Sequence, residues 1–170
     1  MCWIDFKKAF DMVPHSWIIK VMKAYGIAEN ITRFIEVSMS TWNVWLYHKG
    51  VKLCNVPIRR GIFQGDSLSP LLFIMCLFPL SHTILQKSCG YQLNANTIAG
   101  TDRNNLDNVT INHLLYVDDI KLYSKSEKSL RKMIAQVKEF SDNIKMEFGF
   151  EKCKIVNINR GKLDPNTKEP

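Results

Sequence analysis

The segment that most constrains the fold is HLLYVDDIKLYSKS, residues 113–126, in which two adjacent aspartates lie between two apolar runs. Both runs favour β-strands and aspartate favours turns, so the pattern predicts a tight hairpin with Asp118 and Asp119 at its tip. Paired negative charge is unexpected in a chain with a formal net charge of +7. Either the aspartates are ordinary turn residues, which is the stronger interpretation for the dipeptide alone, or they hold a cation.

The remaining chain mixes short strands and helices. Apolar runs and alternation predict strands at CWIDF (2–6), GYQLN (90–94) and CKIVNINR (153–160), and a hairpin at TWNVWLYHKGVKLCNVPI (41–58) around Lys49-Gly50. Helical spacing of apolar residues predicts helices from Pro14 to Gly26, after Asn30, over 69–85 and after Ser126. Residues 94–110 are rich in Asn, Thr, Asp and Gly, which indicates a surface loop. Because strands and helices do not alternate regularly, we expect an α+β fold: an antiparallel sheet with helices packed on one face.

Composition indicates one packed domain with an anionic partner. The chain has 170 residues, 46% of them hydrophobic, and its pI is about 9.2. The apolar content excludes a disordered chain. Excess lysine and arginine favour a nucleic-acid partner, and a solvated basic surface is the alternative.

Cysteine usage and hydropathy favour an intracellular protein, nuclear or cytoplasmic rather than secreted. The five cysteines are widely spaced and form no CxxC pair, which excludes a zinc knuckle and a disulfide framework. The longest apolar stretch, LSPLLFIMCLFPL (68–80), is too short to cross a bilayer and contains two prolines. The N-terminus has no signal-peptide layout, so we expect no membrane partner.

A second acidic position lies in WIDFKKAFD, where Asp5 follows an apolar strand. If that strand neighbours the hairpin, we expect Asp5 beside Asp118. Three carboxylates could then hold two Mg²⁺ ions about 4 Å apart, the arrangement used in phosphoryl transfer, with the carbonyl of Phe6 as a further ligand. Asp11, one turn later, is more consistent with a helix start or a solvent residue.

A third element is RRGIFQGDSLSPLLF, residues 59–73. Gly61 and Gly65 permit close backbone approach, and Asp66 or Ser67 opens a helix whose N-terminal amides favour anions. Gln64 can hydrogen-bond to a base or sugar edge. The alternative, stronger for this stretch alone, is a loop and a cap before a core helix.

Together these stretches resemble the palm of reverse transcriptases, specifically those of non-LTR (LINE-type) retrotransposons. IDFKKAFD resembles the first palm motif, RRGIFQGDSLSPLLF the second and YVDD the third, and GFEKCKIV is similar to the fourth. Their order and spacing match over roughly residues 3–160. YVDD in place of a Gly-Asp-Asp triplet favours an RNA-directed DNA polymerase over an RNA-directed RNA polymerase.

The resemblance implies the site residues. Asp5, Asp118 and Asp119 would be the catalytic metal ligands, with Asp119 the least essential, and the carbonyl of Phe6 would add a ligand. The cofactor would be two Mg²⁺ ions, with Mn²⁺ as an alternative. Lys152 would be the catalytic proton donor to the leaving pyrophosphate, with Lys154 as its competitor; for both lysines a solvated side chain is the alternative.

The resemblance also implies the substrate contacts. Phe10 would be the steric gate beneath the deoxyribose, a role compatible with core packing. Gln64 and Gly65 would contact the incoming nucleotide and template, and Tyr116 would face the primer end. Basic residues would contact phosphates: Lys7, Lys8, Arg59, Arg60 and Lys121. Trp42, Trp45 and Tyr47 are either aromatic contacts to nucleic-acid strands or core residues.

The first motif begins at residue 3 and the chain ends soon after the fourth. We therefore expect a partial palm-like domain over residues 1–160, a disordered tail over 161–170, and fingers and thumb regions largely absent although a full enzyme needs them. The expected function is that of a retrotransposon-derived RNA-directed DNA polymerase fragment, which adds dNTPs to a DNA primer on an RNA template. The alternative is a catalytically inactive remnant that acts as a nucleic-acid-binding or interaction module.

Overall fold

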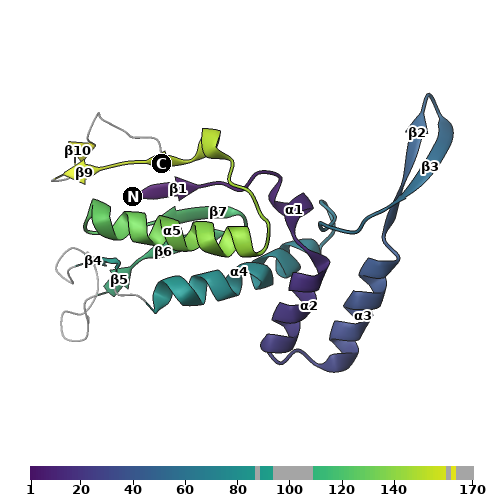
Figure 1. The fold of residues 1–170 in the computed structure, drawn as a ribbon, viewed down its shortest axis with the longest axis horizontal. Coiled ribbons are helices and arrows are strands. Elements are labelled where there is room, and N and C mark those ends of the chain that lie inside the picture. The colour runs from purple at the N-terminus through teal and green to yellow at the C-terminus, as the bar shows by residue number, and fades with distance from the viewer. Residues whose placement is uncertain (87–88, 94–108, 160–161, 164–170) are drawn as a thin grey trace, which may run out of the picture. The chain divides into compact units, whose positions relative to one another are not determined.

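The computed structural model describes residues 1–86, 89–93, 109–159 and 162–163 (Figure 1). The chain divides into two compact units: the first comprises Met1–Lys7, Pro79–Asn143 and Glu147–Pro170, and the second comprises Lys8–Phe78 and Ile144–Met146. The domain boundaries expected at 1–160 and 161–170 stay a prediction, since most of the tail lies outside the described residues.

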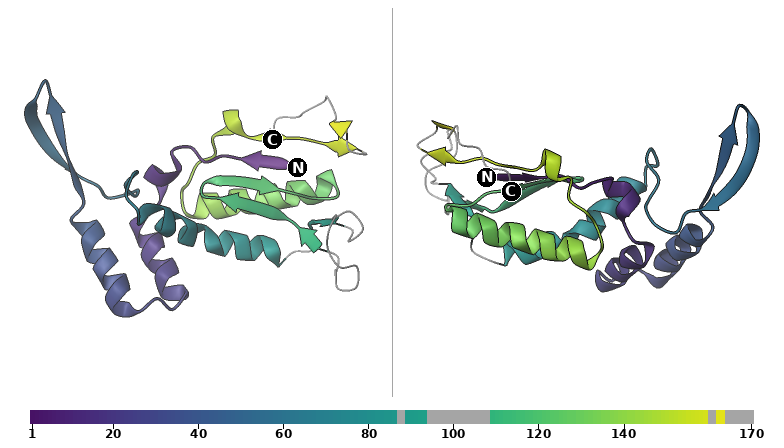
Figure 2. Two further views of the ribbon diagram at one scale, coloured as in Figure 1. Left: turned by 180° about the vertical axis from the view of Figure 1, so that it is seen from behind. Right: turned by 45° about the horizontal axis from the view of Figure 1, so that its top comes forward.

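The first unit is built on a four-stranded antiparallel sheet with the strand order β6–β7–β1–β8. Its strands are β1 (Cys2–Ile4), β6 (His113–Tyr116), β7 (Asp119–Leu122) and β8 (Lys154–Ile155) (Figure 2). The first strand of the chain is therefore central, between partners that come more than a hundred residues later. This arrangement confirms the predicted α+β class with an antiparallel sheet.

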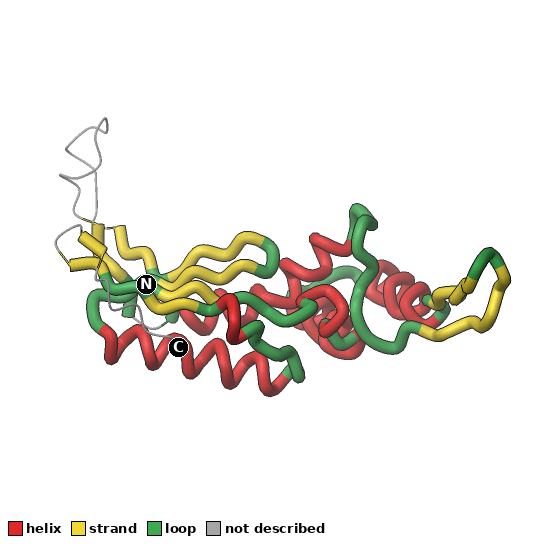
Figure 3. The backbone as a smooth tube through the Cα atoms, turned by 90° about the horizontal axis from the view of Figure 1, so that it is seen from above, coloured by secondary structure: helices red, strands yellow, loops and turns green. Residues whose placement is uncertain are grey.

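One face of this sheet is buried under helices. Its inward side chains are apolar and fully or almost fully buried: Cys2, Ile4, Ile120, Leu122 and Ile155. Helix α5 (Glu127–Asn143) packs against β7 and buries Leu130, Met133 and Val137 (Figure 3). The last part of α4 (Ser69–Leu85) adds Leu80 and Ile84 to the core of this unit.

The opposite, outer face of the sheet carries a mixed set of side chains. Trp3 pairs with Lys121 on one side and with Lys154 on the other. Because side chains at paired positions share a face, these three residues lie on the outer face. The ammonium of Lys121 is 5.7 Å from the ring centroid of Trp3. The sheet thus has a core face and an exposed basic and aromatic face.

Short elements complete the first unit. Strand β4 (Tyr91–Leu93) pairs with β5 (Val109–Ile111), and β9 (Ile158–Asn159) pairs with β10 (Lys162–Leu163). A single 3-10 turn, η2 (Phe150–Lys152), precedes β8. Residues 94–108 of the surface loop expected at 94–110 lie outside the described residues. The last two residues of that range, 109 and 110, belong to β5.

The second unit contains the helices α1 (Ala9–Met12), α2 (His15–Ala24) and α3 (Glu29–Ser40), together with the first part of α4. Helices α2 and α3 pack together. The buried side chains of the two helices recur at helical spacing: Ile18, Ile19, Val21, Met22, Thr32, Ile35 and Met39. From α4 this unit buries Leu72, Phe73, Cys76 and Leu77.

A hairpin of β2 (Asn43–His48) and β3 (Val51–Pro57) extends from the second unit. Its two-residue turn has positive φ at Lys49 (46°) and Gly50 (81°), the combination that a type I′ turn requires. Every residue of both strands is exposed. The hairpin is the one predicted from the alternation around Lys49-Gly50.

Two absences are clear within the described part of the chain. No helix there has the length and hydropathy needed to span a bilayer. All five cysteines are free thiols, and burial raises the pKa of Cys2 and of Cys76 to about 12.

Candidate active site

Strand β1 ends directly before Asp5, and the pairing register brings this residue to the start of β7. Ile4 pairs with Ile120, so the next residue of β1, Asp5, lies across from Asp119. Asp118 is the turn residue next to Asp119, so the register brings Asp5 to the end of the hairpin that carries both aspartates. The expectation that Asp5 lies beside Asp118 stays a prediction. Tyr116, predicted to face the primer end, pairs with Asp119 and is 80% exposed.

The two aspartates are held at the tip of the β6–β7 hairpin by a two-residue turn, Val117–Asp118. Val117 has φ +54°, whereas Asp118 has a negative φ, as in a type II′ turn. Glycine is the residue that fits this position without strain, and a β-branched residue there is an outlier. The turn therefore fixes the backbone that carries Asp118 at some cost in stability.

Asp5 is held in place from its other side by residues 147–149. Phe6 forms an isolated antiparallel bridge with Phe148, and Lys7 N–H donates to the carbonyl of Glu147 at 2.8 Å. Gly149 N–H donates to the backbone carbonyl of Asp5, also at 2.8 Å. A Cβ atom on Gly149 would lie 3.0 Å from Asp5 Oδ2, so only glycine leaves this carboxylate undisturbed.

Lys152 provides a positive charge to the Asp5 carboxylate. Its Nζ lies 3.2 Å from Oδ2 of Asp5, a distance that fits an ion pair. This buried oxygen has no hydrogen-bond partner among the described residues, so the contact with Lys152 is an ion pair. Contact with the Asp5 carboxylate, and more weakly the charges of Glu151 and Asp118, raise the pKa of Lys152.

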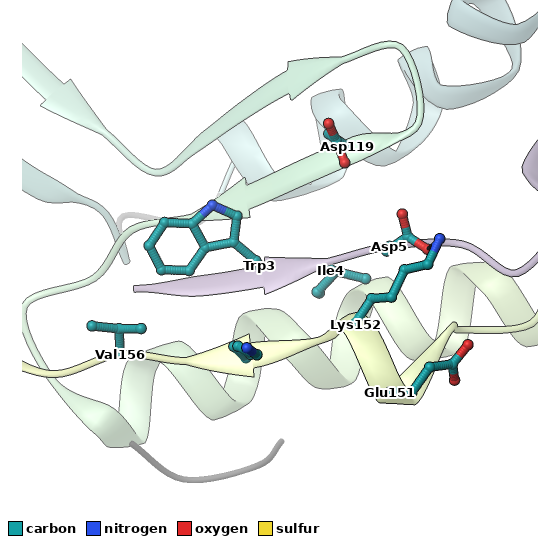
Figure 4. Close-up of a pocket in the computed structure, with 8 residues that line it drawn as sticks. Trp3, Ile4, Asp5, Asp119, Glu151, Lys152 and Val156 are labelled. Carbon is teal, nitrogen blue, oxygen red and sulfur yellow. Dashed lines mark ion pairs between the residues drawn. The ribbon is translucent and has the colours of Figure 1, made fainter. Parts of the chain in front are cut away.

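An open groove of about 670 Å³ runs over this end of the outer face. It is lined by Trp3, Ile4, Asp5, Asp119, Glu151, Lys152, Lys154 and Val156. Figure 4 shows the ammonium of Lys152 beside the Asp5 carboxylate, with the Glu151 carboxylate pointing away from Asp5. The groove thus brings together carboxylates from three segments that are distant in sequence.

The donor set at Asp5 suits a divalent cation only in part. Within the described residues, no three His, Cys, Asp or Glu side chains are grouped so that they could hold a metal ion. The buried Oδ2 of Asp5 without a hydrogen-bond donor, and Asp119 in the same groove, do fit one cation with a preference for oxygen ligands. The two-ion site at Asp5, Asp118, Asp119 and the Phe6 carbonyl stays a prediction.

The predicted nucleotide contacts belong to the second unit. The ring of Phe10 stacks on Phe73, with centroids 4.9 Å apart and planes 9° from parallel. This is the packing role that was expected to be compatible with a steric gate. Gln64 and Gly65 are exposed, and Gly65 has φ +89°. The Asp66 carboxylate accepts from Leu68 N–H at 3.2 Å, in the turn that precedes α4. The nucleotide-binding roles stay predictions.

The two arginines predicted to contact phosphates differ in their surroundings. Arg60 Nε donates to the carbonyl of Met12 at 2.7 Å, and its Nη2 donates to the carbonyls of Ile144 and Lys145 at 3.2 and 2.5 Å. Arg59 is exposed. Arg60 therefore binds two backbone segments of its own unit, and Arg59 is the better candidate for a phosphate contact.

The structure adds residues to the site that were not predicted from the sequence. Trp3, Gly149 and Glu151 all lie at the Asp5 groove or against Asp5. Gly149 is the first residue of GFEKCKIV, the stretch compared with the fourth palm motif, and that glycine was the available signal because glycine permits close backbone approach. Nothing in the sequence pointed to Trp3 or Glu151.

The structure thus defines an α+β protein whose antiparallel sheet carries Asp118 and Asp119 at a hairpin tip, with Asp5 across from Asp119. A family model described as reverse transcriptase (RNA-dependent DNA polymerase) matches residues 1–168, and the chain belongs to that family.

Its relatives are Pol polyproteins of retrotransposable elements. The chain is 30% identical over 168 residues to the retrovirus-related Pol polyprotein from type-1 retrotransposable element R2 of Popillia japonica, covering 97% of the chain and 22% of that relative. It is 24% identical over 155 residues to the corresponding polyprotein from type-2 retrotransposable element R2DM of Drosophila melanogaster, covering 91% of the chain and 13% of that relative. The chain thus spans less than a quarter of the length of these two relatives.

A solved structure shares the fold. An apo telomerase from Candida tropicalis, truncated from its C-terminal domain, superposes with a TM-score of 0.61 at 16% identity. The match covers 99% of this chain and 35% of that one. At this identity the likeness concerns the fold alone.

Proposed function

We propose that this chain is the palm region of a retrotransposon RNA-directed DNA polymerase and adds dNTPs to the 3′-hydroxyl of a primer on an RNA template. The observation that carries the proposal is the β1–β7 register, which brings Asp5 across from Asp119 and next to the turn that holds Asp118. Carboxylates converging at one sheet end are what metal-assisted nucleotidyl transfer requires.

The acidic residues have assigned roles in this proposal. Asp5, Asp118 and Asp119, with the Phe6 carbonyl, would hold two Mg²⁺ or Mn²⁺ ions, which lower the pKa of the primer hydroxyl and offset charge on the leaving pyrophosphate. The strained turn at Val117 orients Asp118, and the contact with Gly149 orients Asp5. Both devices reduce the reorganisation needed when substrate binds.

The remaining predicted residues bind substrate or move a proton. Tyr116 would face the primer end, which its exposure and its pairing with Asp119 support. Phe10 lies beneath the deoxyribose, and Gln64 and Gly65 contact the nucleotide and template. Lys152 Nζ donates a proton to the leaving pyrophosphate, a role supported by its position 3.2 Å from the Asp5 carboxylate.

The chain spans a small part of its relatives, so substrate placement is the step most dependent on other regions. Fingers and thumb regions of a longer polypeptide would hold template, primer and nucleotide at reacting distance, and this placement supplies much of the rate. The net charge of +7 favours binding of nucleic acid by the chain itself, in a salt-dependent manner.

Primer extension on an RNA template with Mg²⁺ tests the proposal, with Asp118→Asn as the decisive variant. We expect the wild-type chain to extend the primer and the variant to lose extension by about a thousandfold, because several kcal/mol of metal-assisted stabilisation are removed. Nucleic-acid binding, measured by fluorescence anisotropy, should remain in both proteins.

Asp11→Asn is the matched control, since Asp11 is an exposed aspartate outside the sheet. It should extend the primer like the wild type. Equal extension by the wild type and Asp118→Asn would contradict the proposal, and binding without extension would support the alternative of a non-catalytic nucleic-acid-binding remnant.

A further inference from the structure

We propose that Lys152 is a resident cation for Asp5: its ammonium occupies the place of a divalent ion and must leave Asp5 before such an ion binds. This inference rests on the proposed function, because it concerns the same carboxylate. It assigns Lys152 a role before the reaction, in setting metal affinity, in addition to the proton transfer proposed above.

The first argument is the unsatisfied oxygen of Asp5. Oδ2 is buried and has no hydrogen-bond partner among the described residues, and the nearest opposite charge is Lys152 Nζ at 3.2 Å. A buried anionic oxygen without a donor is costly unless a cation lies beside it. Lys152 supplies that cation in the absence of any other.

The second argument is that the two partners differ in mobility. The side chain of Asp5 is 20% exposed, whereas that of Lys152 is 66% exposed. The backbone of Lys152 is fixed, since its N–H donates to the carbonyl of Gly149 at 2.8 Å. Only the flexible lysine side chain is free to move, so an arriving ion displaces the ammonium without a rearrangement of the backbone.

The third argument is the charge balance of the groove. Its lining holds three carboxylates (Asp5, Asp119 and Glu151) against two ammonium groups (Lys152 and Lys154). When the Lys152 ammonium swings away, the groove becomes more negative next to Asp5 and attracts a cation more strongly. Lys152 therefore lowers the affinity for a divalent ion without abolishing it.

Mn²⁺ binding to the full chain, followed by the electron paramagnetic resonance signal of free Mn²⁺, tests this inference without any activity measurement. Lys152→Met keeps the length of the side chain and removes its charge. We expect this variant to bind Mn²⁺ about tenfold more tightly than the wild type, because one unit charge beside a partly exposed ion is removed. Lys152→Arg keeps the charge and should bind Mn²⁺ like the wild type.

Lys154→Met is the matched control. Lys154 lines the same groove, and in the strand register it lies opposite Trp3 rather than Asp5. It should change Mn²⁺ affinity by less than twofold. If both methionine variants changed Mn²⁺ affinity equally, the net charge of the groove would explain the effect and the inference would be overturned. Unchanged or weaker Mn²⁺ binding by Lys152→Met would also overturn it.

Asp5→Asn identifies the site that is being measured. It should remove the Mn²⁺ binding that responds to Lys152→Met, and binding unaltered by Asp5→Asn would overturn the inference. Because the readout is metal binding, failure of primer extension leaves this result intact, and failure here leaves the polymerase proposal intact.

Discussion

Gly149 shows how a single residue without a side chain controls the position of a functional one. Its N–H binds the backbone carbonyl of Asp5, and its missing Cβ leaves room for the Asp5 carboxylate. The residue has φ −82°, which any amino acid adopts. Space rather than backbone conformation therefore requires glycine here, unlike at the positive-φ glycines.

Gly149→Ala should weaken Mn²⁺ binding by several-fold with little change in stability. The added Cβ would lie 3.0 Å from Asp5 Oδ2, so the carboxylate must shift by a few tenths of an ångström. Since φ is unstrained, we expect the free energy of unfolding to change by less than about 1 kcal/mol. Denaturant unfolding and Mn²⁺ titration of the same preparation measure both, and wild-type Mn²⁺ affinity in the variant would contradict the role given to Gly149.

The loop before α4 combines a structural arginine with an exposed one, and the two are adjacent in sequence. Gly61 in this loop has φ +87°, and a Cβ there would lie 2.8 Å from the carbonyl oxygen of Asp11. The loop is therefore tightly packed against the end of α1, and Arg60 adds a hydrogen bond to Met12 at the same contact. This packing explains how one arginine of an RR pair becomes structural.

Arg60→Ala should lower stability, whereas Arg59→Ala should weaken RNA binding. Loss of the Arg60 guanidinium leaves three backbone carbonyls without this donor, and we expect a loss of about 2 kcal/mol in the free energy of unfolding. Arg59→Ala should leave stability unchanged, weaken RNA binding and lower the slope of log affinity against log salt by about one. Thermal unfolding and anisotropy at several salt concentrations measure these effects; a destabilised Arg59→Ala protein with normal RNA binding would reverse the assignment.

Elements with a clear local signal were predictable from sequence alone. Helix α4 has the bounds expected from its apolar run, and both the β2–β3 and β6–β7 hairpins occur at the predicted turns. Helix α5 starts after Ser126, whose hydroxyl accepts from Ser129 N–H at 3.2 Å, the predicted cap. Helical and strand periods are local properties, so they can be seen in short windows.

The geometry of the site was less predictable, because it depends on pairing between distant segments. Apolar alternation determines which face of β1 is buried, but the register against β7 is a tertiary property. The sequence therefore predicted Asp5 near the hairpin, whereas the register that brings it across from Asp119 is seen only in the structure. The contact between Asp5 and Lys152 joins opposite ends of the chain, and no local pattern predicts it.

At the scale of the whole chain, the β2–β3 hairpin presents an extended apolar surface. By the pairing register, Val44, Leu46 and Val56 share one face, and each is at least 40% exposed. The other face carries Trp45, whose ring centroid lies 3.3 Å from the ammonium of Lys52. Exposed apolar β-surface with open strand edges favours association of chains.

Leu46→Thr should reduce self-association of the chain without lowering its stability. The side chain is 47% exposed, so little buried area is lost, and threonine retains β-propensity. Tyr47→Thr, at a 62% exposed position on the opposite face, is the matched control and should have a smaller effect. Sedimentation velocity over a range of concentrations measures the effect, and an equal response of both variants would show that the apolar face is not the cause.

The central position of β1 has a consequence for the order of events during protein synthesis. The ribosome makes this strand before both of its hydrogen-bonding partners, β7 and β8, which follow it by more than a hundred residues. Until those strands are made, the apolar strand β1 has no partner to pair with. Pairing between strands so distant in sequence is slow and prone to misfolding. Asp5 therefore acquires its neighbours last, and folding intermediates released early from the ribosome would lack the carboxylate groove.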